Sequence, residues 1–184
     1  SEISVRMVYP AMNDGESKEM AGNGPFPWVV FFGDIEEEIS DYMLIANELA
    51  KKGNIVVVTQ GVAQSNSANI ESHLSMLEEI TLFMIENNYS NNYVIGSFGQ
   101  IDLNHWGIGG HGTGAAAAYS VYPFWQHSSL SSSTQPPRAL FGLGADFSGW
   151  DSGDNWDNLK PLSWTVQPAW PASALFITGT IDEI

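Results

Sequence analysis

Residues 106–118 constrain the fold more than any other segment, because they place a strand, a glycine-rich turn and a helix in immediate succession. The segment is Trp106-Gly-Ile-Gly-Gly-His-Gly-Thr-Gly-Ala-Ala-Ala-Ala118. Its apolar start predicts a short strand over 106–110, and the small residues that follow predict a helix over 115–121 packed closely on a sheet. A chain with this segment is expected to turn sharply from a buried strand into a helix at the edge of a sheet.

The other apolar segments alternate between strand-like and helix-like patterns. Helices are predicted over 36–52, ending at Gly53, and over 69–87, where apolar residues recur at helical spacing. The further predicted strands are 3–8, 28–32, 55–59, 139–145 and 174–178. Because most strands are continuous apolar runs separated by helices, the sequence predicts an α/β fold with a mainly parallel sheet and helices on both faces. The 184 residues fit one domain over 1–184.

The balance of charged residues indicates which classes of partner the chain is able to bind. Six Lys and Arg stand against 21 Asp and Glu, a net charge of −15, and such a surface repels nucleic-acid phosphates. We therefore expect no nucleic-acid partner.

The longest apolar runs, Trp28–Phe32 and Ile55–Val58, are far shorter than the roughly 20 residues of a membrane helix, so no membrane span is expected. The sequence has no cysteine, which excludes disulfides and thiolate metal sites. We expect no metal and no cofactor.

Gly110-His-Gly-Thr-Gly114 fits the pattern of a nucleophile elbow with one change. In G-x-S-x-G the central serine takes a strained conformation at a sharp strand-to-helix turn, and the flanking glycines leave room for it. Here the central residue is Gly112. Glycine accepts the strained backbone more readily than serine does, but it has no Oγ to attack a carbonyl. We expect the turn to form without its usual reaction.

With these residues the chain resembles the dienelactone hydrolase, platelet-activating-factor acetylhydrolase and cutinase-like polyester hydrolase branch of the α/β hydrolases. The likeness covers most of the chain and follows the family's order. Its four segments are Pro27-Trp-Val-Val-Phe-Phe-Gly33, Ala46-Asn-Glu-Leu-Ala-Lys-Lys-Gly-Asn-Ile-Val-Val-Val58, Ile101-Asp-Leu-Asn-His-Trp-Gly-Ile-Gly-Gly-His-Gly-Thr-Gly114 and Ala174-Leu-Phe-Ile-Thr-Gly-Thr-Ile-Asp182. The resemblance implies an α/β-hydrolase fold related to ester hydrolases.

The resemblance also implies roles for individual residues. Gly112 takes the nucleophile position, Asp182 the position of the triad acid, and the backbone N–H of Thr113 one oxyanion donor. The second donor falls at Asp34, whose carboxylate would oppose the charge of an oxyanion unless it points away or is neutral. The family's His follows the acid in chain order, whereas the sequence ends at Ile184. We expect the family's last strand and helix to be absent, which would leave a sheet edge open.

Other residues could take the missing roles, and each has a plainer interpretation. His127 lies beyond the elbow helix, roughly 20 Å from the reactive edge at about 1.5 Å per residue, and His105 begins the strand at the opposite edge. His111 has a structural role in the elbow, and His73 is expected to be partly exposed. Thr113 as a shifted nucleophile would leave His111 at the small-residue position. Asp182 could equally be a turn-forming residue.

Two further clusters lie between residues 146 and 170. Four aspartates resemble an oxygen-rich calcium loop, although their spacing is not that of an EF-hand, and a solvated acidic loop is favoured. These are Asp146, Asp151, Asp154 and Asp157. Four tryptophans could line a cleft for an apolar ligand, although core positions are favoured. These are Trp150, Trp156, Trp164 and Trp170.

Three hypotheses about function stay open. The first is a non-catalytic relative that keeps the fold and cleft and binds an apolar ester-like small molecule. The second is a serine ester hydrolase of the esterase, lipase or cutinase kind, whose sequence is altered at residue 112 and truncated after Asp182. In the third, another chain supplies a segment that completes the open sheet edge. The location is undetermined, and only the acidity and the analogy with secreted polyester hydrolases lean toward an extracellular one.

Overall fold

A computed structural model describes residues 4–13, 15–35, 37–61, 68–89, 99–122, 133–145 and 173–177, with the single residues 125, 128 and 130. For 68–71 and 173–177 it describes the backbone alone. The elements in chain order are β1 (Val5–Val8), β2 (Phe26–Phe32), η1 (Ile39–Tyr42), α1 (Met43–Lys51), β3 (Ile55–Thr59), α2 (Ala68–Tyr89), β4 (Ile101–His111), α3 (Gly112–Val121), β5 (Ala139–Leu143) and β6 (Ser173–Ile177).

The strands form one six-stranded sheet in the order β1-β3-β2-β4-β5-β6. β1 pairs antiparallel with β3, and every other neighbouring pair is parallel. From β2 to β5 the chain returns through α1, α2 and α3, since parallel strands need such crossover connections. β2 and β4 therefore lie side by side at the centre, and their carboxyl ends reach the same edge, where Phe32 pairs with Gly110.

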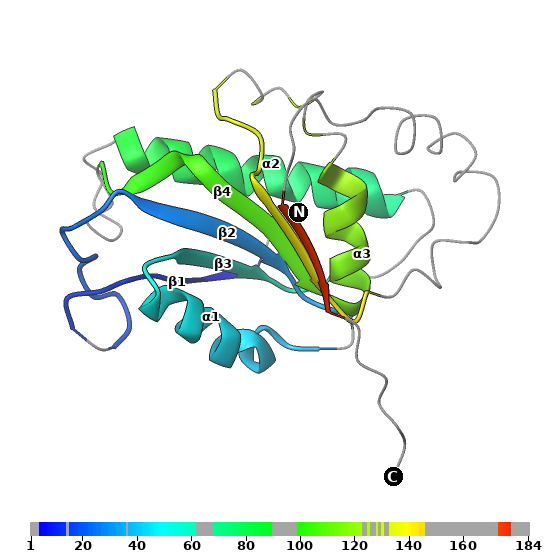
Figure 1. Cartoon of the computed structure of the whole chain (residues 1–184), viewed down its shortest axis with the longest axis horizontal. Coiled ribbons are helices and arrows are strands. Elements are labelled where there is room, and N and C mark those ends of the chain that lie inside the picture. Colours follow the sequence, from blue (N-terminus) through cyan, green and yellow to red (C-terminus); the bar gives the residue numbers. More distant parts are fainter. Residues whose placement is uncertain are drawn as a thin grey trace, which may run out of the picture.

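Helices cover the sheet on both faces, with α1 on one face and α2 and α3 on the other (Figure 1). The alternation of side chains along a strand divides the core in the same way. In β3, Ile55 and Val57 join the larger cluster under α2 and α3, whereas Val56 and Val58 join the smaller cluster under α1. The stacked rings of Trp28 and Trp106, with centroids 4.6 Å apart, lie in the larger cluster.

The structure confirms the predicted α/β fold class, and the strand at 55–59 has the predicted bounds. The other elements differ mainly at their ends. β4 begins five residues earlier than predicted, at Ile101, and α3 starts directly at Gly112. The predicted helix over 36–52 is divided into η1 and α1, and Gly53 follows it with a φ of +87°. Positive φ at this position is typical of a helix that ends in glycine.

No helix in the described part of the chain is long and apolar enough to cross a membrane. The clusters predicted between residues 146 and 170 lie outside the described residues, as do His127 and Asp182. The open edge beyond β6 stays a prediction.

Candidate functional site

The predicted elbow has the backbone of a sharp strand-to-helix turn. His111, the last residue of β4, is extended with φ −122° and ψ 144°, and the next residue, Gly112, has a φ of +54°. A φ in this left-handed region strains any residue with a side chain. α3 begins at the same residue. The turn lies at the carboxyl edge of the sheet, where sites form in parallel α/β proteins.

Gly110 and Gly114 are required because the turn lies directly against β2. A Cβ on Gly110 would stand 2.6 Å from the carbonyl oxygen of Phe32, and one on Gly114 would overlap the carbonyl oxygens of Phe32 and Gly33. These neighbours are backbone atoms in a central strand, so they cannot move aside as a side chain can. The glycines of the motif therefore bring the elbow close to the end of β2.

Asp34, two residues after β2, fills the space that a side chain at residue 112 would occupy. A Cβ built on Gly112 would overlap Oδ2 of Asp34 and lie 2.5 Å from its Cγ. The carboxylate of Asp34 therefore stands where an elbow serine would project. The structure thus brings together two positions that lie 78 residues apart in the sequence.

Hydrogen bonds hold the Asp34 carboxylate in this position. Its Oδ1 accepts a bond from Oγ1 of Thr113 at 2.8 Å and one from the backbone N–H of Ile35 at 2.7 Å. Thr113 is only 6% exposed, so its hydroxyl has few other partners available. The first turn of α3 adds a favourable field, because the amino end of a helix carries partial positive charge. The Asp34 carboxyl group is therefore held against the amino end of α3 by Thr113 and by its own loop.

The backbone N–H of Asp34 is the predicted second oxyanion donor, and it donates to the hydroxyl of Tyr42 at 2.8 Å. The same hydroxyl lies 3.2 Å from Nδ1 of His111, with the direction of that bond set by which ring nitrogen carries the proton. His111 is also 4.0 Å from Oδ2 of Asp34. The side chains of His111 and Asp34 are 40% and 20% exposed, so both can be reached from solvent.

Replacing Tyr42 by phenylalanine tests this network through its pH dependence. Burial raises the pKa of Tyr42, so the folded state holds the phenolic proton more tightly than the unfolded chain does. That contribution to stability is present below about pH 10, the ordinary value for Tyr, and is lost as the pH rises through the raised pKa. Tyr42→Phe should therefore lower the free energy of unfolding by about 1 kcal/mol at pH 7, because the Asp34 N–H loses its partner.

Above pH 10 the same variant should lose less stability than the wild type, since it has no phenol to ionise at residue 42. Urea unfolding at pH 7, 9 and 10.5 measures both effects. Tyr89→Phe is the control, because Tyr89 is 70% exposed and should leave the pH profile unchanged. Equal alkaline losses in Tyr42→Phe and wild type would contradict the burial of this hydroxyl.

Acidic side chains surround this edge of the site. Asp41 accepts a bond from the backbone N–H of Glu38, and a hydrogen bond with Asp41 is the main cause that raises the pKa of Glu37. Like charges on Asp41 and Asp34 add to that rise, and His111 opposes it. The carboxyl groups of Glu37, Asp41 and Asp34 are therefore close enough at this edge to influence one another.

The other described histidines lie apart from this network. His105 is in β4 and pairs with Asp102, 2.8 Å away, on an exposed part of the strand. The predicted exposure of His73 was wrong: it is 2% exposed and packs edge-on against Phe32. The helical pattern of α2 did not reveal this, because the ring is covered by the end of β2. Within the part of the chain that the structure describes, no group of three or more His, Asp or Glu could hold a metal ion.

Comparisons by sequence find no relatives: no family model matches the chain, and no curated protein does. Solved structures do match its fold. A ferulic acid esterase from Streptomyces cinnamoneus has 13% identity and a TM-score of 0.52 over 78% of this chain and 52% of its own. A bacterial heroin esterase has 14% identity and a TM-score of 0.53, covering 78% and 45%. A protein called DphMB1 has 16% identity and a TM-score of 0.52, covering 79% and 44%.

The likeness to these proteins is one of fold. The chain spans about half of the length of the three matched structures. Two of the three are esterases, and each of these two matches 78% of this chain. The chain therefore has the α/β-hydrolase type of fold, with a strained strand-to-helix turn at the carboxyl edge of its sheet.

Proposed function

We propose that this chain is a non-catalytic relative of the ester hydrolases that binds an uncharged ester-like small molecule and does not cleave it. The observation that carries the proposal is the carboxylate of Asp34, which fills the place of a nucleophile at residue 112. Gly112 itself has no hydroxyl to attack a carbonyl, and the neighbouring hydroxyl of Thr113 is bonded to the Asp34 carboxylate. The space for a hydroxyl at residue 112 is already taken.

The charge of the site supports the same conclusion. Acyl transfer needs donors aimed at the position where negative charge develops in the transition state. Here the Asp34 N–H is bonded to Tyr42, and the Thr113 hydroxyl is bonded to the Asp34 carboxylate. A fixed carboxylate beside the carbonyl would raise the energy of an anionic intermediate. A neutral carbonyl compound carries no such charge, so binding is opposed far less than turnover.

Assays of hydrolysis and binding on the same preparation test the proposal. We expect no release of p-nitrophenol from p-nitrophenyl butyrate above the rate with heat-denatured protein, and no covalent labelling by a fluorophosphonate. We expect saturable binding of a phenyl alkyl ketone, which offers a similar carbonyl without a leaving group, followed by ligand-observed NMR. Asp34→Ala should change that binding, whereas Gly22→Ala, remote from the elbow in sequence and with open space around it, should not.

The hydrolysis assays and the binding assay can each contradict the proposal. A burst of p-nitrophenol or a covalent adduct would show that the chain is catalytic. Absence of ketone binding, or binding that Asp34→Ala leaves unchanged, would show that the elbow is not a binding site for carbonyl compounds.

A second candidate is a serine ester hydrolase in which residue 112 is naturally serine. It is favoured by the strained φ of +54° that Gly112 keeps and by the esterases among the matched structures. Because a serine side chain would overlap the Asp34 carboxylate, Gly112→Ser alone is expected to stay inactive. Turnover of p-nitrophenyl butyrate by Gly112→Ser combined with Asp34→Gly would favour this candidate over the first.

A further inference from the structure

A groove of about 890 Å³ lies beside β1, away from the elbow. β1 pairs with β3 on one side, and among the described residues no strand lies on its other side. The groove continues past Val8, which pairs with Val56 near the amino end of β3, whereas the elbow follows the carboxyl end of β4. It is therefore separate from the elbow site, and it is independent of the proposed function.

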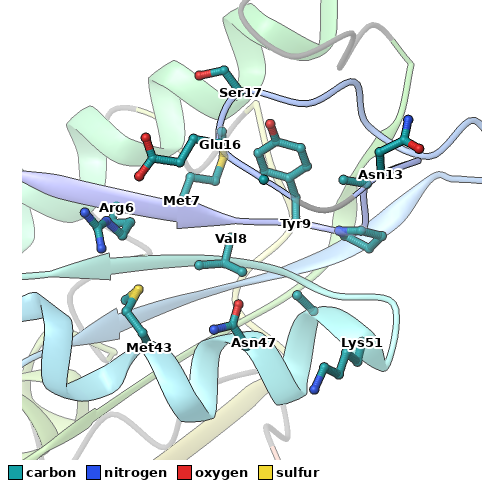
Figure 2. Close-up of a pocket in the computed structure, with 14 residues that line it drawn as sticks. Arg6, Met7, Val8, Tyr9, Asn13, Glu16, Ser17, Met43, Asn47 and Lys51 are labelled. Carbon is teal, nitrogen blue, oxygen red and sulfur yellow. The ribbon is translucent and has the colours of Figure 1, made fainter.

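Side chains from β1, from the loop after it and from α1 surround the groove (Figure 2). Val8 and Met43, which also pack on the smaller core cluster, form an apolar wall, and Asn47 of α1 lies beside them. Met7, on the other face of β1, and Tyr9, directly after the strand, pack on the larger cluster. Sites for small molecules commonly have volumes of about 300–1,000 Å³ and mostly apolar walls with a few polar groups. The groove has this size, and its walls combine apolar side chains with nearly as much polar surface.

The groove is also the place where the few basic residues of this acidic chain gather. Arg6 and Lys51 line it with one carboxylate, Glu16, although the chain as a whole has a net charge of −15. The side chain of Lys18 packs on Gly15, another lining residue, with its Cε 3.0 Å from the position of a Cβ. Three of the six Lys and Arg residues of the sequence thus lie at or beside the groove.

The two lining cations differ in their surroundings. Lys51 pairs with Glu48 at 2.6 Å, and both side chains are mostly exposed, so that pair contributes little and can rearrange. Arg6 is exposed and has no ion-pair partner in the part of the chain that the structure describes. An exposed guanidinium above an apolar wall suits a carboxylate or sulfonate, which it can bind with two parallel hydrogen bonds.

We propose that this groove binds a small amphipathic anion, with its apolar body on Val8 and Met43 and its acidic group held by Arg6 or Lys51. The anion is recognised by local charge. The net negative charge of the protein acts over longer distances and is largely screened beyond about 8 Å at physiological ionic strength. Neutral apolar molecules lack the contact with the cations and bind more weakly.

Two fluorescent probes of similar shape test the proposal. 8-Anilinonaphthalene-1-sulfonate carries a sulfonate, and N-phenyl-1-naphthylamine has the same ring systems without it. We expect saturable binding of the sulfonate with one site per chain and weaker binding of the neutral amine. Arg6→Gln with Lys51→Gln should weaken binding of the sulfonate by roughly tenfold and leave the amine nearly unchanged. Asn47→Trp, on the exposed face of α1, should block both probes by filling the groove.

Arg138→Gln is the control for loss of a cation elsewhere on the surface, because Arg138 is exposed just before β5, and its loss removes one positive charge, as each of the two groove substitutions does. It should leave both affinities unchanged, and circular dichroism should show that every variant is folded. Binding of the sulfonate that survives both Asn47→Trp and the double charge variant would overturn the proposal. Equal affinity for the two probes would also overturn it, since the cations would then play no part.

Discussion

Replacing Gly114 by alanine is expected to lower the free energy of unfolding by about 3–5 kcal/mol, among the largest effects of a single methyl group. The added Cβ would overlap the carbonyl oxygens of Phe32 and Gly33. Both oxygens belong to the backbone at the end of β2, which is held by β3 on one side and β4 on the other. Relief would require the first turn of α3 to move off the sheet. Urea unfolding followed by circular dichroism measures the change.

Gly22→Ala is the matched control for this prediction. Gly22 has no atom within 4 Å of the position of a Cβ, and its φ is not positive. The substitution should therefore change the stability by less than about 0.5 kcal/mol, as is usual for surface positions. If Gly114→Ala were as harmless as Gly22→Ala, the elbow could not lie against β2 as described.

The second large effect is expected at Gly112, where stability should depend on Asp34. Gly112→Ala combines a strained left-handed φ, about 1–2 kcal/mol, with the overlap between its Cβ and the Asp34 carboxylate, about 1–3 kcal/mol. In a protein that already carries Asp34→Ala the overlap is largely removed, because the Cβ of Asp34 stands 3.3 Å from that of residue 112. We expect a coupling free energy of about 2 kcal/mol between the two substitutions in a double-mutant cycle.

Gly53→Ala separates the effect of the left-handed φ from the effect of the overlap with Asp34. Gly53 also has a positive φ, +87°, but nothing lies within 4 Å of its Cβ position. It should lose only about 1 kcal/mol, the usual loss for such a glycine after a helix, and it should show no coupling to Asp34→Ala. Additivity of Gly112→Ala and Asp34→Ala would mean that the carboxylate does not fill the space beside residue 112.

The coupling between residues 34 and 112 also determines what a serine at residue 112 would do to the protein. Introducing a serine there alone would place its side chain in the space of a carboxylate that Thr113 and Ile35 hold by hydrogen bonds. The two residues therefore form one unit, in which a glycine at the elbow and an aspartate after β2 depend on each other.

The alternation of apolar runs and helical patterns predicted the class of fold, because buried parallel strands and the helices that cover them leave separate periodicities in the sequence. The glycine-rich motif at 110–114 separately predicted the sharp turn at Gly112, because it has the pattern of a nucleophile elbow. The structure adds the reason for Gly110 and Gly114, whose positions lie against the end of β2. The alternation did not predict that β4 extends back to Ile101. That longer strand includes polar residues such as Asn104, which a pattern based on apolar runs leaves out.

The chemical character of the site was only partly visible in the sequence. The resemblance put Asp34 near an oxyanion donor, and its charge raised a question that the sequence could not answer. The direction of the carboxylate depends on Thr113 and Ile35, and the direction of the backbone N–H depends on Tyr42. The Thr113 contact joins residues 79 positions apart, and the Tyr42 contact joins the loop after β2 to η1, so no local pattern encodes these two.

Sequence alone thus determined the architecture and the place of the elbow, because both follow from local preferences of backbone and side-chain burial. Only the tertiary structure decided that the elbow is filled by an aspartate from the loop after β2 and that three basic residues lie at or beside one groove. The physical reason is the same in both cases. Steric overlap and charge act through space, and they join positions such as 34 and 112, or 6 and 51, whose separation along the chain says nothing about their distance.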